Sequence, residues 1–308
     1  MNYTLSQLQI FYKISKTKSI TKAAEELHLT QPAVSIQLKN FQNQFDIPLT
    51  EVIGRKLYIT DFGKEVATAA ESILTIVNEI DSKTLAYKGQ LTGYLKISVV
   101  STGKYVVPYF LTDFLKLHPG VELRLDVTNK SKVIDDILKN EVDFSMVSLL
   151  PDIENIDNLE LLQNKLYFVT GSNDLITNKE YDISILKDLP ILFREQGSGT
   201  RTTMEKFFES HGIQLKNKIE LTSNEAVKQA IIAGIGNSVM PLIGIKSELM
   251  NGTLKIIPIK GFPITTNWQL IWSKNKKFSP VAKAFLEYLQ QEKFTIIQKY
   301  FSWFEEYA

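Results

Sequence analysis

The chain has 308 residues, of which 44% are hydrophobic and 22% are charged, with a formal net charge of +1. This composition is that of an ordinary globular protein of two domains or more, and it excludes a disordered or fibrous chain. The chain has no cysteine, which excludes disulfides and thiolate zinc sites, and it has no signal peptide or long apolar run, so we expect a cytoplasmic protein without a metal.

Three short amphipathic helices are predicted in the first 60 residues. Apolar residues recur every three positions from Leu5 to Ile14, which indicates the first helix. Ser19 or Thr21 can cap a second helix, and Thr30 is a good N-cap for a third.

The third helix carries polar residues on a face of its own. Its predicted buried stripe follows spacings of four, three and four: Val34, Leu38, Phe41 and Phe45. A neighbouring open face carries Gln31, Pro32, Ser35 and Lys39. Two helices around a short turn, with small polar residues at the start of the second, are typical of a helix-turn-helix that meets base edges in the major groove. The alternative from the same pattern is an ordinary α-domain with a solvated polar face.

The local sequence favours the first interpretation. Ser19 to Ser35 reads SITKAAEELHLTQPAVS, which closely resembles the helix-turn-helix signature of the LysR-type transcriptional regulators. The resemblance runs in register over residues 1–63 and implies a winged helix-turn-helix in 1–60 that binds double-stranded promoter DNA. It implies the following DNA-binding residues: Thr30, Gln31, Pro32, Ser35 and Lys39 in the reading helix, and Arg55 in the wing.

The wing departs from the family's usual pattern. Thr50 and Val52 stand where the family usually has Phe and Arg, and Gln42 stands where it usually has Glu. These departures imply a less well anchored wing with one phosphate contact fewer.

Residues 61–90 are predicted to form one linker helix with a heptad seam. The seam positions are Phe62, Val66, Ala69, Ile73, Ile76 and Ile80. A lone helix with such a seam needs a partner, so we expect a homodimer through this helix, and a homotetramer as the larger assembly. Packing of the seam against its own domain is the alternative.

Residues 91–308 alternate between predicted strands and helices, which indicates an α/β domain with a mainly parallel sheet. The predicted strands are Tyr94–Val100, Val121–Val127, Phe144–Leu149, Leu166–Thr170, Ile191–Phe193, Ile219–Leu221, Ser238–Met240 and Trp268–Trp272. The predicted helices are Tyr105–Leu117, Val133–Asn140, Thr203–His211, Glu225–Ala233 and Pro280–Glu292.

Helix starts that follow strands point N–H groups toward one edge of a sheet and suit a carboxylate or phosphate. The candidate effector-binding residues at these places are Ser101, Thr102, Lys104, Asn129, Gly199, Thr200, Arg201 and Asn224, and Ser148 in the third predicted strand is a further candidate. Plain helix capping is the alternative for each of them taken singly.

This part of the chain also resembles the LysR-type effector domain, closest to the branch that contains the carbon-fixation regulators. The stretches that carry the resemblance include VVSTGKYVVP from Val99 and REQGSGTR from Arg194. The resemblance implies two lobes like those of a periplasmic binding protein, lobe I at about 91–163 and 266–308 and lobe II at about 164–265. It also implies a small anionic effector, phosphorylated or carboxylate, in the cleft, and RNA polymerase as a further candidate partner.

Other classes of function fit less well. The chain shows no GxSxG motif and no Ser-His-Asp arrangement at the strand ends, so we expect neither an enzyme nor a cofactor. A solute-binding protein would need export. A nucleoid-structuring protein would not need the large second domain.

Overall fold

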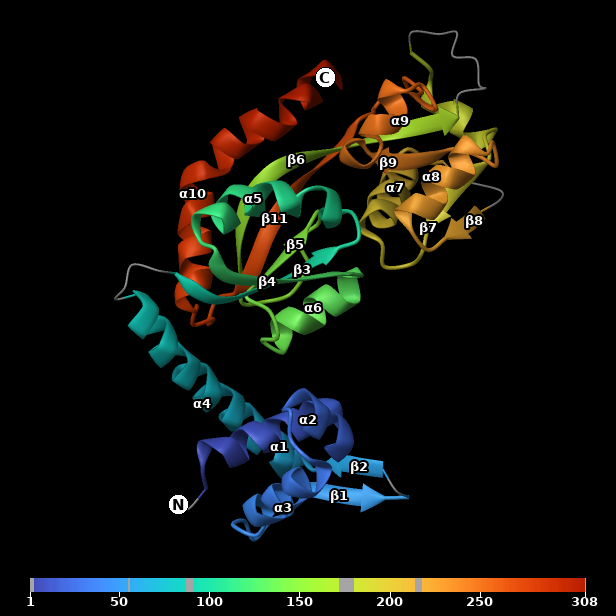
Figure 1. Ribbon diagram of the computed structural model, residues 1–308. Coiled ribbons are helices and arrows are strands. Elements are labelled where there is room, and N and C mark those ends of the chain that lie inside the picture. Colours follow the sequence, from blue (N-terminus) through green and yellow to red (C-terminus); the bar gives the residue numbers. More distant parts are fainter. Residues whose placement is uncertain (1–2, 55, 87–90, 172–179, 214–217, 308) are drawn as a thin grey trace. The chain divides into compact units, whose positions relative to one another are not determined.

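The structure is a computed structural model that describes residues 3–54, 56–86, 91–171, 180–213 and 218–307. The chain forms two compact units, Met1–Gln90 and Leu91–Ala308. The first unit consists of α1 (Leu5–Thr17), α2 (Ile20–Glu26), α3 (Gln31–Gln42), the antiparallel pair β1 (Thr50–Ile53) and β2 (Lys56–Ile59), and α4 (Asp61–Ala86) (Figure 1).

Local signals set the starts of these helices. The side chains of Thr4, Ser19 and Thr30 each accept a hydrogen bond from the backbone N–H three residues further on. Ser19 rather than Thr21 is therefore the cap of α2. Helix α3 ends at Gln42, so the predicted stripe residue Phe45 lies beyond it, where its ring packs against Phe41.

The start of α4 belongs to the core of the first unit. Ala67 and Ala70 are buried in that core, and Phe62 and Val66 pack against it half-buried. The first positions of the predicted seam thus contact their own unit, as the alternative held. Three later positions are exposed: Ile73, Ile76 and Ile80.

The second unit is an α/β domain, as predicted, with more elements than the sequence pattern indicated. Its first part consists of β3 (Thr92–Val100), η1 (Gly103–Tyr105), α5 (Val107–Leu117), β4 (Gly120–Thr128), α6 (Lys130–Leu138), β5 (Phe144–Val147) and β6 (Ile156–Gly171). Its second part consists of η2 (Ile183–Lys187), β7 (Ile191–Arg194), α7 (Gly199–Ser210), β8 (Lys218–Leu221), α8 (Asn224–Ile232), β9 (Ser238–Pro241), η3 (Leu242–Gly244), α9 (Lys246–Met250) and β10 (Leu254–Ile256). The chain ends with β11 (Ile264–Ser273), α10 (Pro280–Phe301) and η4 (Ser302–Tyr307).

The large sheet is mixed, so the prediction of a mainly parallel sheet is wrong. Its strand order is β10-β6-β11-β5-β3-β4, with β9 also paired to β6. Only β3 with β4 and β3 with β5 pair in parallel, while β6 and β11 run antiparallel to each other and to their other neighbours. The reason is the two-lobed layout: the chain crosses once between lobes along β6 and returns along β11, and a crossing and its return are antiparallel.

Each end of the β6–β11 pair belongs to a different lobe (Figure 1). In lobe I, built around β3, β4 and β5, helices α5 and α10 pack on one side and α6 packs against β3, β5 and β11. In lobe II, built around β7, β8 and β9, α7 and α8 pack against the strands. This arrangement brings the carboxyl ends of β3 and β5 close to the start of α7.

Candidate functional site

A small cleft lies where the carboxyl ends of β3 and β5 meet the start of α7. Hydroxyl, amide and cationic groups line it together with a few apolar side chains and one carboxylate. Its lining residues are Val100, Ser101, Thr102, Thr128, Asn129, Lys130, Val147, Ser148, Leu149, Arg194, Glu195, Gly197, Ser198, Gly199 and Thr200. The structure therefore brings together six of the predicted effector residues: Ser101, Thr102, Asn129, Ser148, Gly199 and Thr200.

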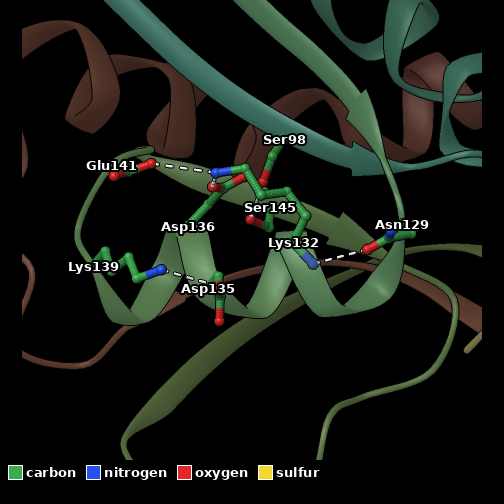
Figure 2. Close-up of polar contacts among 8 residues, drawn as sticks. All are labelled: Ser98, Asn129, Lys132, Asp135, Asp136, Lys139, Glu141 and Ser145. Atoms are coloured by element: carbon green, nitrogen blue, oxygen red, sulfur yellow. Dashed lines mark hydrogen bonds and ion pairs between the residues drawn. The ribbon is translucent and has the colours of Figure 1, made fainter. Parts of the chain in front are cut away.

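Capping accounts for some of these polar groups and not for others. Figure 2 shows Asn129 at the start of α6, where its Oδ1 accepts a hydrogen bond of 2.9 Å from the backbone N–H of Lys132. Ser198, the N-cap residue of α7, and Thr102, at the start of η1, make no side-chain capping bond. Helix capping therefore explains the side chain of Asn129. The hydroxyls of Ser198 and Thr102 lie at the cleft without capping a helix.

The support under α6 is polar and buried. The side chain of Lys132 pairs with the buried Asp136 and with Glu141, and the hydroxyls of Ser98 and Ser145 lie 2.6 Å apart on the strands beneath (Figure 2). The Lys132–Asp136 pair thus satisfies a buried carboxylate within α6, and the Ser98–Ser145 hydrogen bond joins β3 to β5.

Three predicted effector residues lie outside the cleft lining. The Nε of Arg201 donates to Glu205 at 2.9 Å, and its Nη1 donates to Glu220 and to the carbonyl of Arg194. This guanidinium therefore joins α7 to β8 instead of facing the cleft.

Lys104 and Asn224 also take other positions. The Lys104 ammonium lies 4.9 Å from the ring centre of Tyr105, and Asn224 Nδ2 donates to Ser101 Oγ at 3.4 Å from behind the cleft wall. Asn224 therefore positions a lining residue without being one.

The cleft's cations, Arg194 and Lys130, were missed by the sequence analysis. Arg194 is only 4% exposed. Its Nε and Nη2 each donate to the Glu195 carboxylate at 2.7 Å, and Nη2 also donates to Ser101 Oγ at 3.3 Å. The sequence signal was an adjacent pair of opposite charges at the end of a buried strand, which does not by itself show that Arg194 faces the cleft.

In the first unit, the predicted reading face is open to solvent. Thr30, Gln31, Pro32 and Lys39 are exposed and Ser35 is half-buried, while the apolar stripe of α3 faces the core. Arg55 lies outside the described residues.

The entry to the β1–β2 hairpin is anchored by hydrogen bonds, while the lost phosphate contact expected from Thr50 and Val52 stays a prediction. Gln42 Oε1 accepts from the Leu49 N–H at 2.7 Å, Gln42 Nε2 donates to the Ile47 carbonyl, and Thr60 Oγ1 donates to the Pro48 carbonyl at 2.6 Å. The side-chain amide of Gln42 both donates and accepts hydrogen bonds here, whereas an ionised carboxylate can only accept them.

A helix-turn-helix unit with a β-hairpin wing, a long helix and a two-lobed α/β domain with a polar cleft together define a ligand-responsive transcription regulator. Residues 5–64 match the bacterial regulatory helix-turn-helix of the lysR family, and residues 88–293 match the LysR substrate-binding domain. The chain therefore belongs to the LysR family of transcriptional regulators, and its second unit is that family's periplasmic-binding-protein-like effector domain.

Similar proteins come from the carbon-fixation branch, as the resemblance implied. The chain is 35% identical to the transcriptional activator CmpR of Synechocystis sp. PCC 6803, over 94% of this chain and 95% of that protein. It is 38% identical to a RuBisCO operon transcriptional regulator of Acidithiobacillus ferrooxidans, over 93% of each. The solved regulatory domain of Synechocystis CcmR, in complex with 2-PG, is 34% identical with a TM-score of 0.61 and covers 64% of this chain and 96% of that one.

Within the described part of the chain, no helix is both long and apolar enough to cross a membrane. The same residues contain no group of three or more side chains that could hold a metal ion.

Proposed function

We propose that this regulator binds promoter DNA as a homodimer and that its cleft binds a small phosphorylated carboxylate of the 2-phosphoglycolate type. One observation carries the proposal: a buried guanidinium and a lysine meet hydroxyls and two helix starts in a single cleft. The 2-PG complex of a 34% identical regulatory domain supports the same ligand chemistry.

The chemistry of the cleft suits two negatively charged groups. The starts of α6 and α7 present backbone N–H groups that favour an anion. Arg194 offers a planar fork for a carboxylate or phosphate, and Lys130 offers a point charge. The start of α7 approaches Ser148, the residue after β5, so closely that a Cβ on Gly199 would lie 3.2 Å from Ser148 Oγ. The small cleft suits a small ligand.

The first unit supports the DNA-binding part of the proposal. Gln31 and Ser35 stand at the start of α3, where side chains of a reading helix meet base edges. The exposed isoleucines of α4 offer the apolar surface for a second copy of the chain. Such a protein works in the cytoplasm, needs no catalytic group, and would meet RNA polymerase at its promoter.

Titration calorimetry on the full-length protein tests the ligand. We expect 2-phosphoglycolate to bind, and we expect Lys130→Ala to weaken binding about tenfold, the size of one lost charged contact. Lys104→Ala is the matched control, because Lys104 lies outside the cleft lining. If neither 2-phosphoglycolate nor inorganic phosphate binds the wild type, the proposed ligand class is wrong.

A footprint on the promoters that flank its own gene, with and without the ligand, tests the regulatory part. We expect a protected site whose length or spacing changes with 2-phosphoglycolate, because an effector acts by favouring one arrangement of the protein. Protection that is identical at all ligand concentrations would contradict ligand control.

A further inference from the structure

The cation best placed to bind an anionic effector is already paired within the chain. The two 2.7 Å bonds from Arg194 Nε and Nη2 to Glu195 are the bidentate geometry that a ligand carboxylate or phosphate would adopt. Glu195 itself lines the cleft, and it is the only acidic residue among the described residues that do so.

An anion that enters the cleft therefore finds the Arg194 guanidinium already bound to the Glu195 carboxylate. The Nε–Nη2 edge of Arg194 cannot hold two carboxylates at once, so an incoming anion that takes this edge must replace Glu195. Arg194 is buried, and a buried guanidinium left without any partner is strongly destabilising. Exchange of one anion for another keeps Arg194 paired throughout.

We propose that Glu195 is an internal stand-in for the effector, which occupies the Arg194 fork until an anionic ligand displaces it. This inference rests on the proposed function of the cleft. It assigns Glu195 a role in specificity: a neutral molecule cannot replace the carboxylate, and an anion must compete with it.

The surroundings allow this exchange. The Glu195 side chain is 25% exposed, so it has a route to water, whereas that of Arg194 is 5% exposed. Glu195 begins a turn in which the Ser198 N–H donates to the Glu195 carbonyl at 3.2 Å and Gly197 has a φ of +85°. The Nη2 bond to Ser101 ties Arg194 to lobe I and keeps the guanidinium at the cleft when Glu195 leaves.

The exchange also couples ligand binding to the two lobes. Arg194, on lobe II, is held by Glu195, its own neighbour, and by a single side-chain bond to Ser101 on lobe I. A ligand that replaces Glu195 would bridge Arg194 to Lys130, the first residue of α6 on lobe I. Ligand binding thus exchanges a contact within lobe II for a contact between lobes.

Titration calorimetry of Glu195→Gln with 2-phosphoglycolate and with inorganic phosphate tests this role. The glutamine keeps the size of the side chain and one acceptor but loses the charge. We expect both anions to bind about tenfold more tightly than in the wild type, because the competitor for Arg194 is weakened. Glu209→Gln, an exposed glutamate of α7, should bind both anions as the wild type does.

The outcomes separate this inference from the proposed function. If the wild type binds 2-phosphoglycolate and Glu195→Gln binds it equally or less tightly, Glu195 is not a competitor and the inference is wrong. If the wild type does not bind 2-phosphoglycolate but Glu195→Gln binds phosphate, the proposed ligand fails and the stand-in role holds. If neither protein binds either anion, both fail.

Discussion

The Tyr105 hydroxyl, on the η1 turn of lobe I, donates a hydrogen bond to the Glu225 carboxylate in the first turn of α8 in lobe II. Lys228 extends this contact, since its ammonium lies 3.1 Å from Glu225 and 2.8 Å from Glu248 on α9. The chain Tyr105–Glu225–Lys228–Glu248, which we call the interlobe network, is separate from the cleft lining. It therefore joins the two lobes through residues outside the cleft lining.

Tyr105→Phe should loosen the join between the lobes. The change removes one hydrogen bond to a charged group, and because Glu225 is about half exposed and keeps Lys228, we expect a loss of about 1 kcal/mol, or a Tm lower by about 3 °C. Differential scanning calorimetry of the full chain measures this. Tyr94→Phe, at an exposed tyrosine of β3, is the control, and equal Tm values for the two variants would contradict a role for the Tyr105 hydroxyl.

Acid should weaken the same network. Burial raises the pKa of Glu225, but hydrogen bonds from Tyr105 and Lys228 outweigh it, so the pKa lies below the ordinary value of 4.5. A lowered carboxyl pKa contributes stability above about pH 4.5 that is lost as the pH falls through the folded-state pKa.

The matching variant is Glu225→Gln, compared with the wild type from pH 7 to pH 3. We expect the wild type to have the higher Tm at pH 7 and the difference to shrink below about pH 4.5. A difference that stays constant over this range would show that the charge of Glu225 does not stabilise the fold.

Local signals made part of this structure predictable. Ser19 and Thr30 act through hydrogen bonds to residues three positions away, so the sequence placed the start of α3 and narrowed the start of α2 to Ser19 or Thr21. The first half of β6, from Ile156 to Gln163, was not predicted, because its residues are mixed polar and apolar and pair with β11 more than 100 positions later.

The sequence predicted most of the residues that bring hydroxyl groups to the cleft, but it did not predict which charged residues line the cleft. Arg194 is the last residue of β7 and Arg201 lies in the first turn of α7, and the sequence does not show which one faces the cleft. Contacts in the folded chain decide which arginine faces the cleft. Glu205 and Glu220 hold Arg201 between α7 and β8, whereas Arg194 lines the cleft.

Gln31→Ala should reduce binding to the promoter site without changing the fold. The Gln31 side chain is exposed at the start of α3, and loss of one base contact costs about 1–3 kcal/mol, so we expect a loss of about 10- to 100-fold in affinity for that site. Ser35→Arg should abolish or redirect binding. Electrophoretic mobility shifts with random competitor DNA measure both, and Gln9→Ala, at an exposed glutamine of α1, is the control. Sequence-specific binding at full strength by both variants would remove α3 as the reading helix.

Charges on the exposed part of the linker helix should break the dimer. Ile73, Ile76 and Ile80 are 37%, 59% and 59% exposed in the single chain, and a carboxylate in a paired apolar seam would be buried without a partner. We expect Ile76→Asp to shift the protein toward monomer in sedimentation velocity. Thr75→Asp, on another face of the same helix, should leave the assembly unchanged. If both variants sediment as the wild type does, these residues do not form the dimer interface.

The C-terminal segment supplies a stability test with an internal control. Phe304 in η4 is 6% exposed and packs edge-on against Phe301 and Trp303, whereas Phe294 in α10 is 70% exposed. Removing a buried phenylalanine ring costs about 3–5 kcal/mol, and an exposed one costs about 0.5 kcal/mol or less.

Phe304→Ala should therefore lower the Tm by about 9–15 °C, while Phe294→Ala should leave it nearly unchanged. The contact also reaches β6, because Lys165 Nζ donates to the Phe304 carbonyl at 3.1 Å, so hydrogen exchange should increase around Lys165 in Phe304→Ala. Equal Tm values for the two alanine variants would mean that η4 does not stabilise the effector domain, and increased exchange confined to residues after Phe301 would mean that it does so without affecting β6.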